Sequence, residues 1–232
     1  MKEKMNGKKF LTDYLPAIAT FVGIVVCGII YKQQFIKLLP VCISLIIGMF
    51  TIKANRIAFL IGAANCFVYI VGYASERLYG SVLSTLFSAI IQFSSFLLWK
   101  KRAYKQATEF RALKNGARVG LYLGVIIVWA ITSFVLYKTG ANAVVLDGLI
   151  FVLGFVVPIM QMFALIDAVP LHILSAVVNI VMWCQIVFAG NFANLTYLIN
   201  GPYTLAVVIR AGVKWFELYK EQQAKRRENE GI

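Results

Sequence analysis

The stretch IAFLIGAANCFVYIVGYAS (57–75) is apolar and long enough to cross a bilayer, and within it an amide, Asn65, precedes an aromatic ring, Tyr69, by four residues. The stretch VPLHILSAVVNIVMWCQIVF (169–188) repeats this arrangement with Asn179 and Trp183. A spacing of four residues puts both side chains on one face of a helix. Because an amide is costly to expose to lipid, such a face turns toward a cavity or a partner helix. The repeated pair predicts a duplicated bundle around one central site, which is the layout of a transporter.

The composition places the whole chain in the membrane class. Of its 232 residues, 60% are hydrophobic and 14% are charged, whereas a soluble domain is about 45–50% apolar and about 25% charged. We interpret the net charge of +13 as basic cytoplasmic loops and not as a nucleic-acid surface. The four cysteines fall inside apolar spans, no two cysteines are spaced as CxxC, and His172 is the only histidine. The sequence therefore indicates neither a metal site, nor a disulfide framework, nor a cofactor.

Eight segments are apolar enough to cross a membrane, for which about 20 residues are needed. The second is the weakest because Pro40 interrupts it, and the first is expected to be retained because no small-residue cleavage site follows the basic N-terminus. A basic segment, 100–117, divides the chain into two halves of four spans. The predicted spans are 14–31, 35–52, 57–75, 79–99, 118–137, 143–166, 169–188 and 193–215.

The basic residues predict the orientation. Of the 23 lysines and arginines, Arg210 lies inside the last span and four lie in outer loops, namely Lys32, Lys37, Arg77 and Lys138. The other lysines and arginines, which include Lys2 and Lys4, fall in segments that lie on the same side of the membrane as the N-terminus. This asymmetry follows the positive-inside rule, so we expect both termini in the cytoplasm.

The two halves are expected to be a parallel repeat. Alignment of Asn65 on Asn179 also pairs Tyr69 with Trp183, and two extra residues in the second copy then pair Trp99 with Trp215. Because four spans separate the copies, both run in the same direction through the membrane. Transporters built from such repeats hold their substrate at the interface between them.

Polar side chains follow one face of four spans at helical spacing. Amides and hydroxyl groups suit a neutral polar ligand, and aromatic rings suit a flat one. The predicted substrate-binding residues are Asn65, Tyr69, Gln92, His172, Ser175, Asn179, Trp183, Asn200 and Tyr203. For Ser84, Ser88 and Ser95 we expect tight helix packing instead.

Three further polar or aromatic residues have other expected roles. Trp99 and Trp215, near span ends, are expected to be interfacial anchors. Asp147 lies about one turn into its span. At this position it could receive substrate, couple transport to protons, or cap the start of a helix, and we favour capping.

Three stretches resemble the PnuC family of nicotinamide riboside transporters: KANRIAFLIGAANCFVYIVGYASERLYG (53–80), TGANAVVLDGLIFVL (139–153) and VVNIVMW (177–183). The resemblance covers roughly residues 40–216. It implies an all-α membrane protein with a SWEET-like arrangement, in which two parallel three-helix bundles are joined by a linker helix and one extra helix comes first. The corresponding divisions are 1–34 (tail and extra helix), 35–99 (first bundle), 100–142 (basic loop and linker helix), 143–216 (second bundle) and 217–232 (charged tail).

The resemblance also implies facilitated diffusion of a nucleoside or vitamin, which a cytoplasmic kinase then traps by phosphorylation, and it implies that members form trimers. Family members carry a W-x-x-W-x-x-x-N/D pattern on the seventh span. Aligned through Asn179, the tryptophan positions are His172 and Ser175 here. This departure favours a family substrate other than nicotinamide riboside, such as a deoxynucleoside or another vitamin.

The leading hypothesis is therefore a bacterial inner-membrane uniporter that imports nicotinamide riboside or a related nucleoside or vitamin. The alternative is the substrate-capturing subunit of an ATP-driven vitamin importer, a class that usually has six spans and no parallel four-span repeat. An intramembrane enzyme is disfavoured because the sequence has no P-loop, HExxH or GxSxG motif.

Overall fold

The computed structural model describes residues 7–33, 35–101, 103–104, 107–141 and 143–230. Some residues that entered the predicted orientation or divisions lie outside this part of the chain, namely Lys2, Lys4, Arg102, Lys105 and residues 34, 142 and 231–232. The described residues form eight α-helices, one 3-10 turn and two short strands. These are α1 (Gly7–Ile30), α2 (Phe35–Ile52), α3 (Ile57–Ser75), α4 (Tyr79–Lys101), β1 (Ala103–Tyr104), β2 (Ala107–Thr108), α5 (Asn115–Lys138), α6 (Val144–Met162), α7 (Ala168–Phe188), η1 (Phe192–Asn194) and α8 (Leu195–Glu230).

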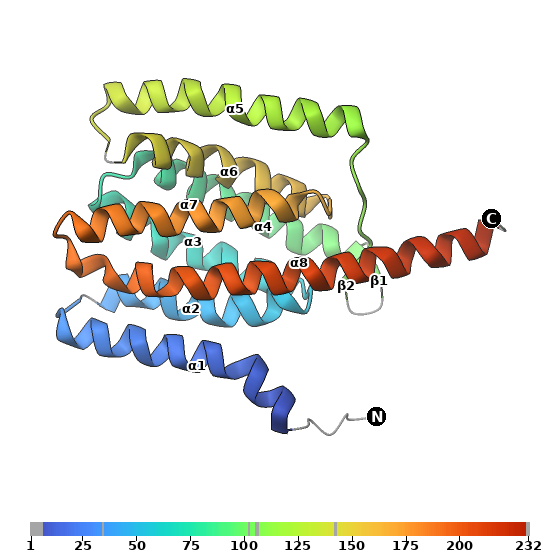
Figure 1. The fold of residues 1–232 in the computed structure, drawn as a ribbon, viewed down its shortest axis with the longest axis horizontal. Coiled ribbons are helices and arrows are strands. Elements are labelled where there is room, and N and C mark those ends of the chain that lie inside the picture. Colours follow the sequence, from blue (N-terminus) through green and yellow to red (C-terminus); the bar gives the residue numbers. More distant parts are fainter. Residues whose placement is uncertain (1–6, 34, 102, 105–106, 142, 231–232) are drawn as a thin grey trace.

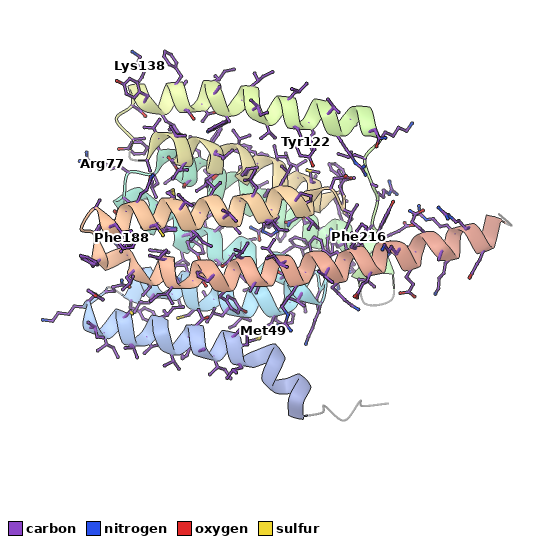
Figure 2. All side chains as sticks on the ribbon, in the orientation of Figure 1. Met49, Arg77, Tyr122, Lys138, Phe188 and Phe216 are labelled. Carbon is purple, nitrogen blue, oxygen red and sulfur yellow. The ribbon has the colours of Figure 1, made fainter. Side chains whose placement is uncertain are left out.

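The helices lie side by side along one direction, and the described chain begins and ends at the same end of the molecule (Figure 1). Arg77 and Lys138 lie at the opposite end (Figure 2). Each predicted apolar segment forms a helix, so the helical fold class is confirmed. The described part of the predicted charged tail, residues 217–230, is helical and belongs to α8, which has 36 residues.

Six helices, α3 to α8, are long and apolar enough to cross a membrane. The apolar parts described for α1 and α2, Leu15–Ile30 and Lys37–Ile52, are shorter than the other six. A protein with at least six such helices is a multi-pass membrane protein. The count of eight spans stays a prediction.

The helices pack in two sets of three with matching contacts. Helix α3 packs between α2 and α4, and α7 packs between α6 and α8. The two sets meet twice, where α4 packs on α6 and where α8 packs on α2. Helix α1 lies against α2 and α8, and α5 lies against α6, so each set is preceded by a helix that packs on its outside (Figure 1).

The α2–α3 and α6–α7 turns have the same backbone structure. Ala54 and Ala164 adopt left-handed φ values of 50° and 56°, and their N–H groups donate to Thr51 O and Gln161 O over the same distance, 2.9 Å. A left-handed residue commonly ends a helix in this way. The two turns are 110 residues apart.

At the other end of α3 and α7, the left-handed residues are Arg77 and Gly190, which are 113 residues apart. The separation grows along these helices, so no single offset aligns both ends of α3 and α7. The predicted pairing of Asn65 with Asn179 uses a separation of 114, larger than either. The repeated turns thus support two equivalent halves but not that residue pairing.

Asp147 caps a helix, but not the one that carries it. Its carboxylate, which is fully buried, accepts hydrogen bonds from Gly80 N and Ser81 N at 3.0 Å and from Ser81 Oγ at 2.5 Å. Two of these donors are the free N–H groups at the start of α4, where the helix dipole also favours a negative charge. Asp147 belongs to α6, so this cap joins the two halves.

We expect Asp147→Ala to lower the free energy of unfolding by about 2 kcal/mol, because buried donors at the start of α4 lose their acceptor. Asp147→Asn keeps one acceptor oxygen and is expected to lose less. Thermal unfolding in detergent measures both, with Glu217→Ala at an exposed position as the control. Equal melting temperatures for Asp147→Ala and Glu217→Ala would contradict the capping role.

Candidate functional site

An outer cavity of about 240 Å³ lies between the two halves, toward the end opposite the described termini. Its walls come from α2, α3, α7 and α8. The predicted residues Tyr69, His172, Ser175, Asn179, Trp183 and Asn200 all line it, together with Ser44, Tyr73, Ala176, Tyr197, Gly201 and Thr204. Side chains from two pairs of helices that are distant in sequence, α2 with α3 and α7 with α8, therefore converge on one polar, aromatic space.

An inner cavity, also of about 240 Å³, lies toward the end with the termini. Gln92, another predicted residue, lines it with Thr51, Asn55 and Gln161, and Trp99 and Trp215 lie at its inner end. His172 and Ser175 line both cavities. The two cavities therefore adjoin at these side chains, and we name them the inner and outer chambers and, taken together, the path.

Hydrogen bonds orient the polar side chains around the chambers. Ser44 Oγ donates to Asn200 Oδ1 at 3.1 Å, and Asn200 Nδ2 donates to Thr204 Oγ1 at 3.2 Å. At the junction, Gln161 Nε2 lies 3.0 Å from His172 Nδ1. If the amide donates, the imidazole carries its proton on Nε2. The junction ring is thus held in one orientation by its neighbour.

The side chain of Gln92, on α4, is positioned by its contacts with α3. Its Nε2 donates to Cys66 Sγ at 3.3 Å. A Cβ atom at Gly62 would lie 2.0 Å from Gln92 Oε1. A side chain at position 62 would therefore displace this amide from its place between α3 and α4.

Stacked rings line one side of the outer cavity. Trp183 and Tyr197 stack with centroids 4.5 Å apart and planes 11° apart, and Tyr73 stacks on Trp183 at 6.1 Å. A ligand ring between two others needs about 7 Å, twice the carbon contact distance. A flat solute therefore stacks on the cavity-facing side of this group, or it enters only after Trp183 and Tyr197 separate.

Two predicted site residues line neither cavity. Asn65 is 3% exposed, and its Nδ2 donates to Pro40 O at 2.9 Å. Tyr203 is 8% exposed, and its Oη donates to Leu45 O at 2.9 Å. Both bind backbone carbonyls of α2. Their contacts hold α3 and α8 against that helix.

Trp99 and Trp215 are not interfacial anchors as expected. They are 2% and 3% exposed, and each indole donates to a backbone carbonyl of the other half, Trp99 to Gln161 O at 2.9 Å and Trp215 to Thr51 O at 3.2 Å. The two acceptors are 110 residues apart, the same separation as in the repeated turns. The tryptophans form a matched pair of bonds between the halves.

Several lining residues were not predicted from the sequence. Tyr73 and Thr204 follow the predicted Tyr69 and Asn200 by four residues, so helical spacing alone was sufficient to include them. Ser44 and Gln161 stand in otherwise apolar parts of α2 and α6, where no polar stripe marks them. Their position is evident only once the halves are assembled.

No Asp, Glu, Lys or Arg is among the described residues that line the two cavities. A charged group buried without an opposite charge is costly. The chambers therefore offer amide, hydroxyl, imidazole and aromatic groups, which suit a neutral polar solute or a flat ring.

Comparison with known proteins agrees with this geometry. A family model described as nicotinamide mononucleotide transporter matches residues 34–216. The solved structure titled "Crystal structure of the Vitamin B3 transporter PnuC" superposes with a TM-score of 0.78, covering 91% of this chain and 93% of that one at 16% identity. At this identity the likeness shows the fold. A search of curated proteins found no match. The family resemblance seen in the sequence is confirmed.

A matched pair of Tyr→Phe substitutions tests the assignments of the hydroxyl groups. Tyr203→Phe loses the bond to Leu45 O and is expected to reduce stability by about 1 kcal/mol. Tyr197→Phe removes a buried hydroxyl that has no hydrogen-bond partner among the described residues, so no loss of stability is expected. Thermal unfolding compares the two, and a larger loss for Tyr197→Phe would contradict both assignments.

Proposed function

The chain belongs to the nicotinamide mononucleotide transporter family, and we propose that it imports nicotinamide riboside or a related nucleoside-like vitamin precursor by facilitated diffusion. The observation that carries this proposal is the two-chamber path between the halves. Its walls combine stacked rings with amide and hydroxyl groups. A nucleoside has the matching parts, a flat base and a polyhydroxylated sugar.

We propose the nucleoside and not its phosphate as substrate. A phosphate group is normally recognised by Arg, Lys or several N–H groups. The residues described around the chambers include no Arg and no Lys, so a buried phosphate would keep its charge uncompensated. A permanently cationic base would instead gain a cation–π contact with an aromatic ring that lines the outer chamber, such as Tyr69.

The size of the path supports a ligand that occupies both chambers. Sites for small organic molecules have volumes of about 300–1,000 Å³. Each chamber alone, at about 240 Å³, is smaller than this range, whereas the two together fall within it. We place Asn179, Asn200 and Tyr69 on the outer part of the ligand and Gln92 on its inner part, with His172 and Ser175 beside its middle.

The proposed architecture is SWEET-like, with α2–α4 and α6–α8 as parallel bundles, α5 as the linker helix and α1 as the additional one. The reciprocal contacts α4 on α6 and α8 on α2 support it. We place the protein in the bacterial inner membrane with both termini in the cytoplasm, because the described chain begins and ends on one side (Figure 1) and the basic segments lie there.

Facilitated diffusion is favoured over ion coupling because no carboxylate lines the described chambers. Net uptake then requires a sink. We propose that a cytoplasmic kinase phosphorylates the nucleoside, since the phosphate produced does not fit the path back. A homotrimer is proposed on the family resemblance alone.

Uptake into proteoliposomes that contain only this protein tests the mechanism. We expect radiolabelled nicotinamide riboside or thymidine, assayed separately, to equilibrate across the membrane without ATP or an ion gradient. Excess unlabelled nucleoside inside is expected to accelerate labelled entry, and nicotinamide mononucleotide is expected not to compete. Tight binding without equilibration would instead support the alternative, a substrate-capturing subunit that needs an ATPase.

Substitutions of amides test the proposed site. Asn179→Ala and Gln92→Ala are each expected to reduce uptake about tenfold at subsaturating substrate, the factor for about 1.4 kcal/mol of lost hydrogen bonding. Gln185→Ala is the control, because Gln185 is an exposed amide on α7 outside both chambers. Unaltered uptake by folded Asn179→Ala protein would remove that residue from the site.

A further inference from the structure

Residues Thr108–Leu113, here named the strap, run from the last residue of β2 toward the start of α5. The strap lies at the inner end of the path. Gln222 on the extension of α8 binds the strap backbone twice. Phe110 N donates to Gln222 Oε1 at 2.8 Å, and Gln222 Nε2 donates to Thr108 O at 2.9 Å. Gln222 is 3% exposed. One buried amide thus holds the strap as a neighbouring strand would.

The next residues of the strap bind the α6–α7 turn. Arg111 N donates to Ala164 O at 3.0 Å, and Ile166 N donates to Arg111 O at 2.8 Å. Leu113 N donates to Asp167 Oδ2 at 2.7 Å. Near the start of the strap, Glu109 forms an ion pair with Arg226 of α8. All these polar contacts are made with the second half of the molecule.

The side chain of Phe110 packs behind the two tryptophans that line the inner chamber. It is fully buried and lies against both tryptophans at the inner end of that chamber, with centroid distances of 6.0 Å to Trp99 and 5.4 Å to Trp215. The two indoles are themselves 5.8 Å apart. The three rings thus form one aromatic cluster at the inner end of the chamber.

On the side of the first half, the Phe110 ring belongs to one buried apolar cluster with Trp99 and Ala54. Burial of apolar surface is non-directional, whereas the hydrogen bonds to α8 and the α6–α7 turn are directional. A separation of the halves at this end therefore breaks ring contacts and the two indole bonds, but it leaves the strap attached to the second half.

We propose that the strap is the inner gate of the path, that Phe110 is its plug, and that Gln222 is the positioning residue that keeps the plug in place. Opening parts Phe110 from Trp99 and Ala54 while the strap stays on α6–α8. This inference rests on the proposed transport function, but its test needs no substrate.

The test measures access to the inner chamber from each side of the membrane. Ala58 lines that chamber, so Ala58→Cys serves as the reporter after the four native cysteines are replaced by alanine. A membrane-impermeant thiol reagent is added to sealed vesicles of each orientation. Phe110→Ala and Gln222→Leu are each expected to raise the rate of labelling about tenfold from the side of the termini only, which corresponds to about 1.4 kcal/mol.

Two control variants separate gating from general loosening. Gln223→Leu alters the same kind of side chain one residue on, and Gln223 forms neither of the strap bonds of Gln222. Phe87→Ala removes a ring stacked on Phe155, away from both chambers. Both are expected to keep the parental rate of labelling.

Three results would overturn the proposal. They are parental labelling in folded Phe110→Ala and Gln222→Leu proteins, an equal rise from both sides of the membrane, and misfolding of both variants, which assigns the strap a purely structural role. Failure of nucleoside uptake with the predicted labelling pattern would instead count against the proposed substrate and leave the gate in place.

Discussion

Lipid offers no hydrogen bonds, and this constraint sorts the polar side chains of the protein into two groups. One group binds backbone across a helix contact: Asp147 at the start of α4, Asn65 at Pro40, and Tyr203 at Leu45. The other group, with Asn179 and Gln92 among its members, lines the chambers. The first group holds the helices around the second, so the path depends on buried polar contacts that never face a solute.

The apolar lengths were sufficient to predict the helices, because a membrane span needs a long stretch without charges and the turns between spans break that pattern. They were not sufficient to predict which amides face the path. Asn65 and Asn179 have the same local signature, yet Asn65 faces α2 and Asn179 faces the outer chamber. Helical spacing identifies a polar face, but the neighbour that the face meets is decided by the packing of helices distant in sequence.

The same limit explains the tryptophans. An aromatic residue near a span end is commonly an interfacial anchor, and sequence alone does not distinguish that role from a buried one. Here two facts that are visible only in three dimensions decide it. Trp99 and Trp215 reach carbonyl groups at equivalent turns of opposite halves, and a loop ring, Phe110, covers both. The basic segment 100–117 gave no sign of this contact, because its charges indicate exposure.

The two halves have matching helix contacts and turns, but they differ in the segments that follow their last spans. Helix α4 is followed by a hairpin and the strap, whereas α8, its counterpart, continues as a helix to the end of the described chain. The continuation of α8 supplies Gln222, and the loop after α4 supplies Phe110. The ends of two equivalent helices thus differ, because one leads to the proposed plug and the other carries its support. The strap follows α4 of the first half, and Gln222 on α8 of the second half binds it. The contacts that place the proposed plug are therefore also contacts between the two halves.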